Sequence, residues 1–262
     1  GWIRGPGELE SLLDTAPLRR FLCRALGTPG RPQDPIEGIR ANLERGRLRA
    51  LALSTSSYTT GRSVTWVEGR EGIEPWERPL RRSRMGRITV DHVMASAALP
   101  LLFPAVQLEG EWYGDGGIRL AAPLSPALHL GADRILAIST RFDRTTAEEE
   151  RPQVEGYPPL AQVAGQLMNA VFLDVLDQDA WRVEQTNHLL SRLPATERGD
   201  LRVVEIAHLR PTLDLGRLAA DFEIDLANHL AARLLLTPRL VELNSDFGID
   251  GAELEQALYT AL

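Results

Sequence analysis

The chain of 262 residues contains one pattern that strongly restricts its fold, a helix signal that leads directly into an unbroken apolar strand. In "PLSPALHLGADRILAIST", Ser125 is a candidate helix cap, Pro126 occupies the first helical position and Gly131 falls just past the helix end. The run from Arg134 to Thr140 is then apolar without alternation, which is typical of a strand covered on both faces. Helices that alternate with such strands predict a parallel or mixed sheet with helices on its faces.

The same order of elements recurs further along the chain. The segment from Pro159 to Leu190 is predicted to be a long amphipathic helix, and "LRVVEIAHL" after it is strand-like. The apolar stripe of this helix consists of Leu160, Val163, Leu167, Val171 and Val175. Because no repeat or long linker separates these segments, we predict a single α/β domain over residues 1–262, with a helical C-terminal region over 157–262.

The N-terminal half contains shorter elements. "LESLLDTAPLRRFLCRAL" predicts a helix capped by Asp14 or Thr15, with Pro17 in its first turn. Two strands are expected at 48–54 and 63–68, followed by a loop over 69–87 that is rich in glycine, proline and charge. A short helix capped by Thr89 comes next, and a hairpin turning at Glu109-Gly110 then carries Asp115 at the end of its second strand.

Charge and hydropathy exclude several classes of protein. The formal net charge of −7 argues against nucleic-acid binding, which needs a basic surface. The longest apolar stretch, from Met94 to Val106, is too short to cross a bilayer and contains two prolines. The one cysteine, Cys23, lies in the apolar stretch of the first helix, so we expect a buried free thiol, a reducing compartment and a cytoplasmic or peripheral membrane location.

A resemblance to a known family lies in "VMASAALPLLFPAVQLEGEWYGDGGIRLAAPLSPALHLGADRIL", residues 93–136. The ordered string of an Ala-Ser helix, Leu-Pro and Phe-Pro, a hairpin, Asp-Gly-Gly and Gly-Ala-Asp before a strand resembles the catalytic-aspartate segment of the patatin-like phospholipases. "DTAPLRRFL" and "LALSTSSYTTGRSVTW" are similar to upstream segments of that family. The likeness covers residues 12–140 well and the helical C-terminal region loosely. It implies a three-layer α/β sandwich with a parallel or mixed central sheet.

The resemblance also implies an activity. Members of this family hydrolyse fatty-acyl esters, often phospholipids, with a Ser-Asp dyad and without any metal or organic cofactor. Asp115 matches the dyad aspartate, and Gly116 and Gly117 complete its motif. A hydroxyl nucleophile needs a base within about 2.6–3.2 Å, and partial desolvation makes a carboxylate a better base. We expect Trp112, Tyr113 and "LPLLFP" to desolvate Asp115, and the glycines to permit positive φ and close backbone approach.

The sequence departs from the family in one large respect, because it contains neither Gly-x-Ser-x-Gly nor a glycine-rich oxyanion loop. Ser63, in "GRSVT", lacks the second glycine and lies in a strand pattern, so it is rejected as the nucleophile. In patatin-like phospholipases, the Gly-x-Ser-x-Gly motif and the glycine-rich oxyanion loop both come before the segment that matches the first predicted helix of this chain. We therefore expect an N-terminally truncated chain that is inactive by itself.

Two other functions stay open. A non-catalytic patatin-like protein that binds lipid or acts as a scaffold would need no nucleophile. A carboxylate enzyme such as a glycosidase would pair Asp115 with Glu109 or Glu111. The partners expected are a fatty-acyl ester or phospholipid and a membrane surface contacted peripherally, with no nucleic acid and no transmembrane segment.

For the remaining polar residues, a structural role is an alternative to any functional one. Turn chemistry accounts for Asp133, and the histidines have no metal-ligand spacing; they are His92, His129, His188, His208 and His229. Three aspartates are assigned to the solvated face of the long helix, in preference to a cation site; they are Asp174, Asp177 and Asp179. A basic cluster either attracts anionic head groups or pairs with Glu74 and Glu77; it comprises Arg78, Arg81, Arg82, Arg84 and Arg87. "LPLLFP" either lines an acyl channel or belongs to the core.

Overall fold

The structure, a computed structural model, describes residues 11, 13–28, 31–119, 122–139, 142, 157, 163, 167, 174–199 and 201–212. They divide into two compact units, one ending at Gly116 and one beginning at Gly117. Much of the predicted C-terminal region, including His229, the first half of the long helix and the side chain of Asp174, lies outside the described residues. That residues 1–262 form a single domain stays a prediction.

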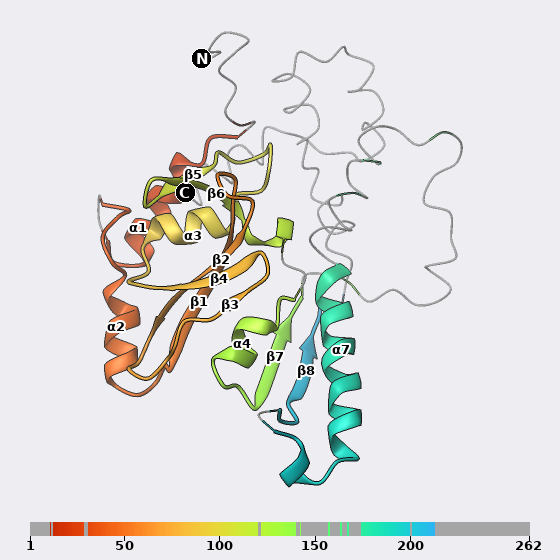
Figure 1. Ribbon diagram of the computed structural model, residues 1–262. Helices are drawn as coiled ribbons and strands as arrows, with labels where there is room; N and C mark the ends of the chain where they lie inside the picture. Colours follow the sequence, from red (N-terminus) through yellow and green to blue (C-terminus); the bar gives the residue numbers. More distant parts are fainter. Residues whose placement is uncertain are drawn as a thin grey trace. The chain divides into compact units, whose positions relative to one another are not determined.

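The first unit is built on a six-stranded mixed sheet with the order β3-β4-β2-β1-β6-β5 (Figure 1). Its strands are β1 (Ala50–Ser57), β2 (Ser63–Gly69), β3 (Glu77–Arg78), β4 (Arg81–Met85), β5 (Val106–Leu108) and β6 (Glu111–Asp115). The pairs are antiparallel except for β2 with β4, which is parallel. The predicted strands at 48–54 and 63–68 are confirmed, and the observed β1 extends three residues further, to Ser57.

The predicted loop over 69–87 is wrong in part, because it contains β3 and β4. β4 reads "RRSRM", which has no apolar alternation to mark it as a strand. The strand forms because its backbone pairs with β2, from Ser63 opposite Arg81 to Val67 opposite Met85, and because acidic partners neutralise several of its arginines. Pairing with a buried neighbour has overridden a weak local preference.

Three helices pack on the sheet face that carries Val64 and Trp66, and together they form the core of this unit. They are α1 (Ala16–Ala25), α2 (Glu37–Glu44) and α3 (Val90–Ser96). α1 supplies the buried Cys23, which is a free thiol as predicted. For α1, the Asp14 side chain accepts the Ala16 N–H at 2.8 Å, while Thr15, at the N-cap, makes no side-chain cap.

α3 places small residues directly against the sheet, as predicted. It begins with a capping box in which Thr89 Oγ1 accepts the His92 N–H at 3.4 Å and His92 Nδ1 accepts the Thr89 N–H at 3.2 Å. Such a box satisfies two backbone donors that the first helical turn leaves without partners. The fully buried Ala95 lets the helix lie close to β1, β5 and β6.

The second unit contains a parallel pair of strands with helices. Its elements are η1 (Gly116–Arg119, a 3-10 helix that starts at the last residue of the first unit), α4 (Ser125–His129), β7 (Arg134–Ile138), α7 (Asp174–Ser191), η2 (Ala195–Glu197) and β8 (Glu205–Leu209). β7 and β8 pair over five residues, so the predicted strands are confirmed. Asn187 holds the start of β8 at both backbone groups of Val204, with distances of 2.7 and 2.9 Å.

Two details of this unit differ from the prediction. Ser125 is the first residue of α4 and makes no cap, although Gly131 does follow the helix with φ of 87°. β7 alternates between buried and exposed residues, with Leu136 62% and Ile138 68% exposed, so the prediction of a strand covered on both faces is wrong. An apolar run in sequence cannot distinguish a two-sided strand from a one-sided one with apolar residues on its open face.

The acidic residues of α7 correct a further prediction. Asp179 is buried and accepts the Leu124 N–H at 2.9 Å, so it does not lie on a solvated face. Asp177 forms an ion pair with Arg210 at 2.6 Å. In the part of the chain that the structure describes, no helix is both long and apolar enough to cross a membrane.

Candidate active site

The β5–β6 hairpin fixes the position of Asp115, as predicted. Glu109 and Gly110 form its turn with φ of 50° and 84°, values that a tight hairpin requires. β6 then runs beside β1, with Asp115 opposite Thr55. The Asp115 N–H donates to the Ala98 carbonyl at 2.9 Å, at the end of α3. The backbone that carries the carboxylate is therefore held from a strand on one side and from a helix end on the other.

The glycines on either side of Asp115 are required by packing. A Cβ on Gly114 would lie 2.6 Å from Cζ of Tyr58, and one on Gly116 would lie 2.6 Å from the carbonyl carbon of Ser54. The predicted close backbone approach is thus confirmed at Gly116. The expected positive φ is wrong, because Gly116 and Gly117 open η1 with conformations outside the left-handed region.

Tyr58 is the neighbour of Asp115 that the sequence did not single out. Its N–H donates to the Trp112 carbonyl at 2.9 Å, and its ring occupies the space beside Gly114. Burial raises the pKa of the Tyr58 phenol, and the negative charge of Asp115 raises this pKa further. The available signal was Gly114 itself, since a glycine inside a strand often marks a close approach by another group.

The aromatic residues beside Asp115 do not act as expected. Side chains alternate along a strand, so Tyr113 shares a face with Asp115 and Trp112 points to the other face. Tyr113 is fully buried in the core, edge-on to Trp66 at 5.5 Å between ring centroids. Trp112 is 50% exposed. The expectation that Trp112 desolvates the carboxylate is not supported. The charge of Asp115 acts instead on the phenol of Tyr58, which lies against Gly114.

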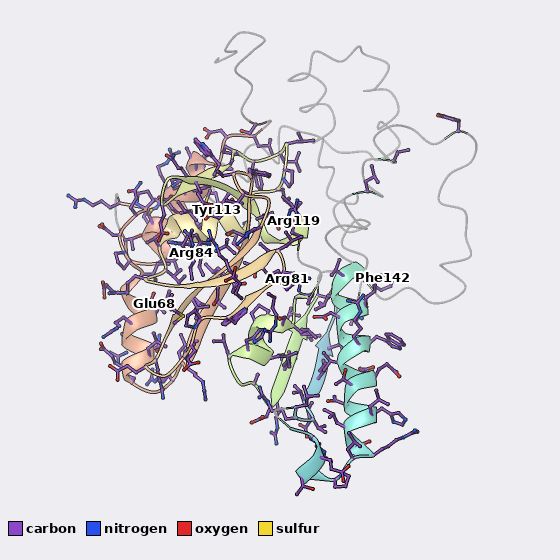
Figure 2. All side chains as sticks on the ribbon, viewed as in Figure 1. Glu68, Arg81, Arg84, Tyr113, Arg119 and Phe142 are labelled. Atoms are coloured by element: carbon purple, nitrogen blue, oxygen red, sulfur yellow. The ribbon has the colours of Figure 1, made fainter. Side chains whose placement is uncertain are left out.

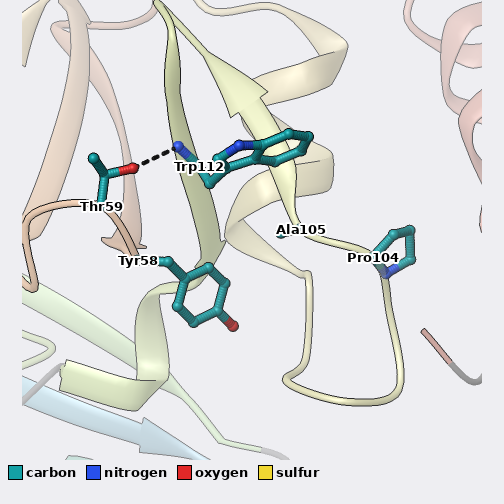
Figure 3. A pocket seen from close by; sticks show the side chains of 5 residues that line it. All are labelled: Tyr58, Thr59, Pro104, Ala105 and Trp112. Carbon is teal, nitrogen blue, oxygen red and sulfur yellow. Dashed lines mark hydrogen bonds between the residues drawn. The ribbon is translucent and has the colours of Figure 1, made fainter. Parts of the chain in front are cut away.

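A cavity of about 500 Å³ adjoins this region. Among the described residues, its lining consists of Tyr58, Thr59, Pro104, Ala105 and Trp112 (Figure 3). The Trp112 N–H donates to Thr59 Oγ1 at 3.1 Å, which ties the β1–β2 turn to β6. The cavity is open on one side and mostly apolar, the usual character of a small-molecule site.

The "LPLLFP" strip is neither wholly core nor wholly cavity wall. Leu101 is 82% exposed and has φ of 68°, and Leu102 and Phe103 are half-buried. Only Pro104 of this strip contributes to the cavity among the residues described. The strip forms a loop on the surface beside the cavity, held by an N–H from Leu13 to the Leu102 carbonyl at 2.9 Å.

Most of the predicted basic cluster is neutralised, but by other acids than predicted. Arg84 pairs with Glu109 and Glu111, Arg82 pairs with Glu111, and Arg87 pairs with Glu37 and Glu68. Glu77 pairs with Arg62 instead. Arg84 also lies over the Trp66 ring, at the sheet face that carries Tyr113 (Figure 2). These contacts make the cluster part of the framework of the sheet.

Glu111 is held as a carboxylate. Its partial burial raises its pKa, but hydrogen bonds from Ser57 and Tyr113 and the charges of Arg84 and Arg82 outweigh this effect and lower the pKa below its ordinary value. A glycosidase needs one carboxyl group with a raised pKa to donate a proton. Glu111 has the opposite shift and Glu109 is paired with Arg84 at 2.7 Å, so the site does not favour that chemistry.

The other candidates have structural roles. His92 caps α3 and packs against Trp66, and burial lowers the pKa of its imidazole. His188 lies 2.8 Å from an Arg192 nitrogen, and Asp133 pairs with Arg202. Ser63 is buried at the start of β2. The described residues contain no group of three or more His, Cys, Asp or Glu side chains that could hold a metal ion.

Comparison with known proteins gives one finding. Residues 2–128 match the family model described as patatin-like phospholipase. This span includes the hairpin, Asp115 and all of α4 except its last residue, His129. No curated protein matches the chain. The mixed sheet with flanking helices agrees with the α/β sandwich expected of that family.

Proposed function

We propose, from the match of residues 2–128 to the patatin-like phospholipase family model, that this chain supplies the base of a serine acyl hydrolase acting on fatty-acyl esters. The observation that supports it is the fixed position of Asp115. Its backbone N–H donates a hydrogen bond to the Ala98 carbonyl, and the next residue, Gly116, packs so closely on the Ser54 backbone that a Cβ would clash with it. A carboxylate held in this way can accept a proton without reorganisation at the moment of reaction.

The chemistry follows the Ser-Asp dyad. A serine hydroxyl attacks the ester carbonyl, Asp115 takes the hydroxyl proton, and donors of an oxyanion hole stabilise the tetrahedral oxyanion. The acyl carbon–oxygen bond then breaks, and the alcohol part of the ester leaves with the proton that Asp115 took from the serine. Asp115 next takes a proton from a water molecule, whose attack on the acylated serine releases the fatty acid and returns the proton to the serine oxygen. Gly-x-Ser-x-Gly does not occur in the 262 residues, so the proposal places the nucleophile on another segment. The chain by itself is then expected to hydrolyse no ester.

The test is Asp115→Asn in a protein that joins this chain to the segment bearing the nucleophilic serine. A general base contributes about 10²–10⁴-fold, so kcat/KM for a fatty-acyl ester should fall by about that factor. Asp133→Asn is the matched control, because Asp133 is an exposed carboxylate that pairs with Arg202 in the second unit. Undiminished hydrolysis by Asp115→Asn would exclude the proposed role.

A lipid-binding function without catalysis is the second candidate. The mostly apolar cavity beside Tyr58 and the exposed Leu101 favour it, since neither feature needs a nucleophile. The same experiment separates the two. A joined protein that binds a fluorescent phospholipid but hydrolyses no ester, before any substitution, would support lipid binding and contradict the hydrolase.

A further inference from the structure

A second cavity lies at the other end of the β1–β2 pair. Asp115 is opposite Thr55, near the end of β1, whereas this cavity adjoins the start of β1, where Ala50 pairs with Gly69. Its volume is about 460 Å³. Among the described residues it is lined by Gly46, Arg47, Arg49, Arg70, Glu71 and Ile73. Three arginines therefore converge on one hollow in a chain whose net charge is −7.

These arginines differ from the cluster at residues 78–87 in their ion pairing. Within the part of the chain that the structure describes, no ion pair joins Arg47, Arg49 or Arg70 to a carboxylate. Arg84 and Arg87, by contrast, each contact two glutamates. Three positive charges with a single carboxylate, Glu71, in the same lining leave a net repulsion, which a bound anion would relieve.

The backbone holds one of the three in a defined orientation. Arg70 donates from Nε to the Leu48 carbonyl at 3.0 Å, which leaves its terminal nitrogens available. A Cβ on Gly46 would lie 3.1 Å from Arg70 Nη2, and Gly46 has φ of 76°. The glycine thus serves both the turn after α2 and the close approach of the guanidinium. A guanidinium fixed in this way loses less entropy when it binds a ligand.

We propose that this cavity binds a phosphate group. Three arginines and Glu71 leave two net positive charges, which match the charge of about −1.5 to −2 that a phosphate monoester carries near pH 7. Guanidinium groups fit phosphate oxygens through paired N–H donors. The ligand is either a phosphate ester free in solution or the phosphate of a lipid head group, and the site is separate from Asp115 in either case.

The first measurement is the binding of inorganic phosphate to the full chain by calorimetry, at constant ionic strength set with chloride. Arg70→Gln and Arg47→Gln should each weaken binding about tenfold, because each removes charge-assisted hydrogen bonds. Arg47→Gln is the second variant because the Arg47 side chain forms no hydrogen bond with the residues that the structure describes, so the substitution should leave the fold intact. Arg70→Lys keeps the charge but loses the planar pair of donors, so its affinity should fall between wild type and Arg70→Gln.

Arg20→Gln is the matched control, since Arg20 is an exposed arginine on α1, outside the cavity. It should change phosphate affinity less than about twofold. An equal loss in Arg20→Gln, or no saturable phosphate binding by the wild-type chain, would overturn the proposal. Asp115→Asn should bind phosphate as wild type does, so this result is independent of the hydrolase test.

Vesicles identify the source of the phosphate. We would compare sedimentation of the chain with phosphatidylcholine vesicles that contain or lack phosphatidic acid, whose head group is a phosphate monoester. Binding that requires phosphatidic acid and is lost in Arg70→Gln assigns the site to a lipid head group. Phosphate binding without vesicle binding assigns it to a soluble phosphate ester. Vesicle binding that survives in both Arg70→Gln and Arg47→Gln, with no phosphate binding, would contradict the site.

Discussion

Residue by residue, the most closely packed position near Asp115 is Gly116. The Ser54 carbonyl that lies against Gly116 also accepts the Ser96 hydroxyl at 2.8 Å, so it is fixed from a second side. We predict that Gly116→Ala lowers the free energy of unfolding by about 1–3 kcal/mol, because the added methyl meets backbone that cannot move freely. Urea denaturation measures this change.

Gly38→Ala is the control for that substitution. Gly38 lies in α2, its Cβ would meet nothing within 4 Å, and its φ is ordinary. Alanine there should raise the free energy of unfolding by about 0.5–1 kcal/mol, because glycine weakens a helix interior. If both variants change stability in the same direction, the packing argument for Gly116 fails.

Glu111 gives a prediction in acid. Its pKa in the folded chain is lowered below the ordinary value of 4.5, so its contribution to stability is fully present above that value. The contribution disappears as the pH falls through the lower, folded pKa. Wild type should therefore lose more unfolding free energy between pH 6 and pH 3 than Glu111→Gln does, as measured by urea denaturation at each pH. An equal or larger loss in Glu111→Gln would contradict this assignment.

Some residues of the candidate site could be predicted from the sequence, and others could not. The position of Asp115 was predictable, because a turn at Glu109-Gly110 sets where β6 ends. Tyr58 was not, because it directly follows β1, more than fifty residues earlier, and only the fold brings it to Gly114. The partners of Arg82 and Arg84 were missed for the same reason, since Glu111 reaches them across the sheet.

Among the elements, those with local signals were predictable and those that depend on partners were not. Thr89 marks the start of α3, and Gly131 follows the end of α4. β4 carries no such signal, because three of its five residues are arginines and its strand character comes from pairing with β2. In α7, the sequence could not distinguish the buried Asp179 from the half-buried Asp177, since both carry the same side chain on one helix.

α7 supplies the prediction at this scale. Asp179→Ala should lower the free energy of unfolding by about 1–3 kcal/mol, because it leaves the Leu124 N–H buried without its acceptor. Asp177→Ala breaks a partly exposed pair with Arg210 and should cost about 1 kcal/mol or less, since water can replace the carboxylate. Thermal or urea unfolding compares the two. An Asp179→Ala variant no less stable than Asp177→Ala would show that the buried bond does not anchor the helix.

For the whole molecule, the net charge hides how charge is distributed over the surface. A net charge of −7 argues against a broadly basic surface, yet this sum conceals three arginines that line one cavity. They come from two parts of the chain, 47–49 and 70, that β1 and β2 bring together. The sequence directed attention to residues 78–87 instead, where arginines are dense but largely paired. The arginines that lie closest together in the sequence are therefore not the ones that share this cavity.

The contact between Tyr58 and Gly114 couples the residues that these two positions can hold. The tyrosine ring occupies the volume that any larger residue at position 114 would need. A larger residue at position 114 therefore requires either that the half-exposed Tyr58 ring moves or that position 58 becomes smaller. Substitutions at positions 58 and 114 should therefore be non-additive in their effect on the free energy of unfolding.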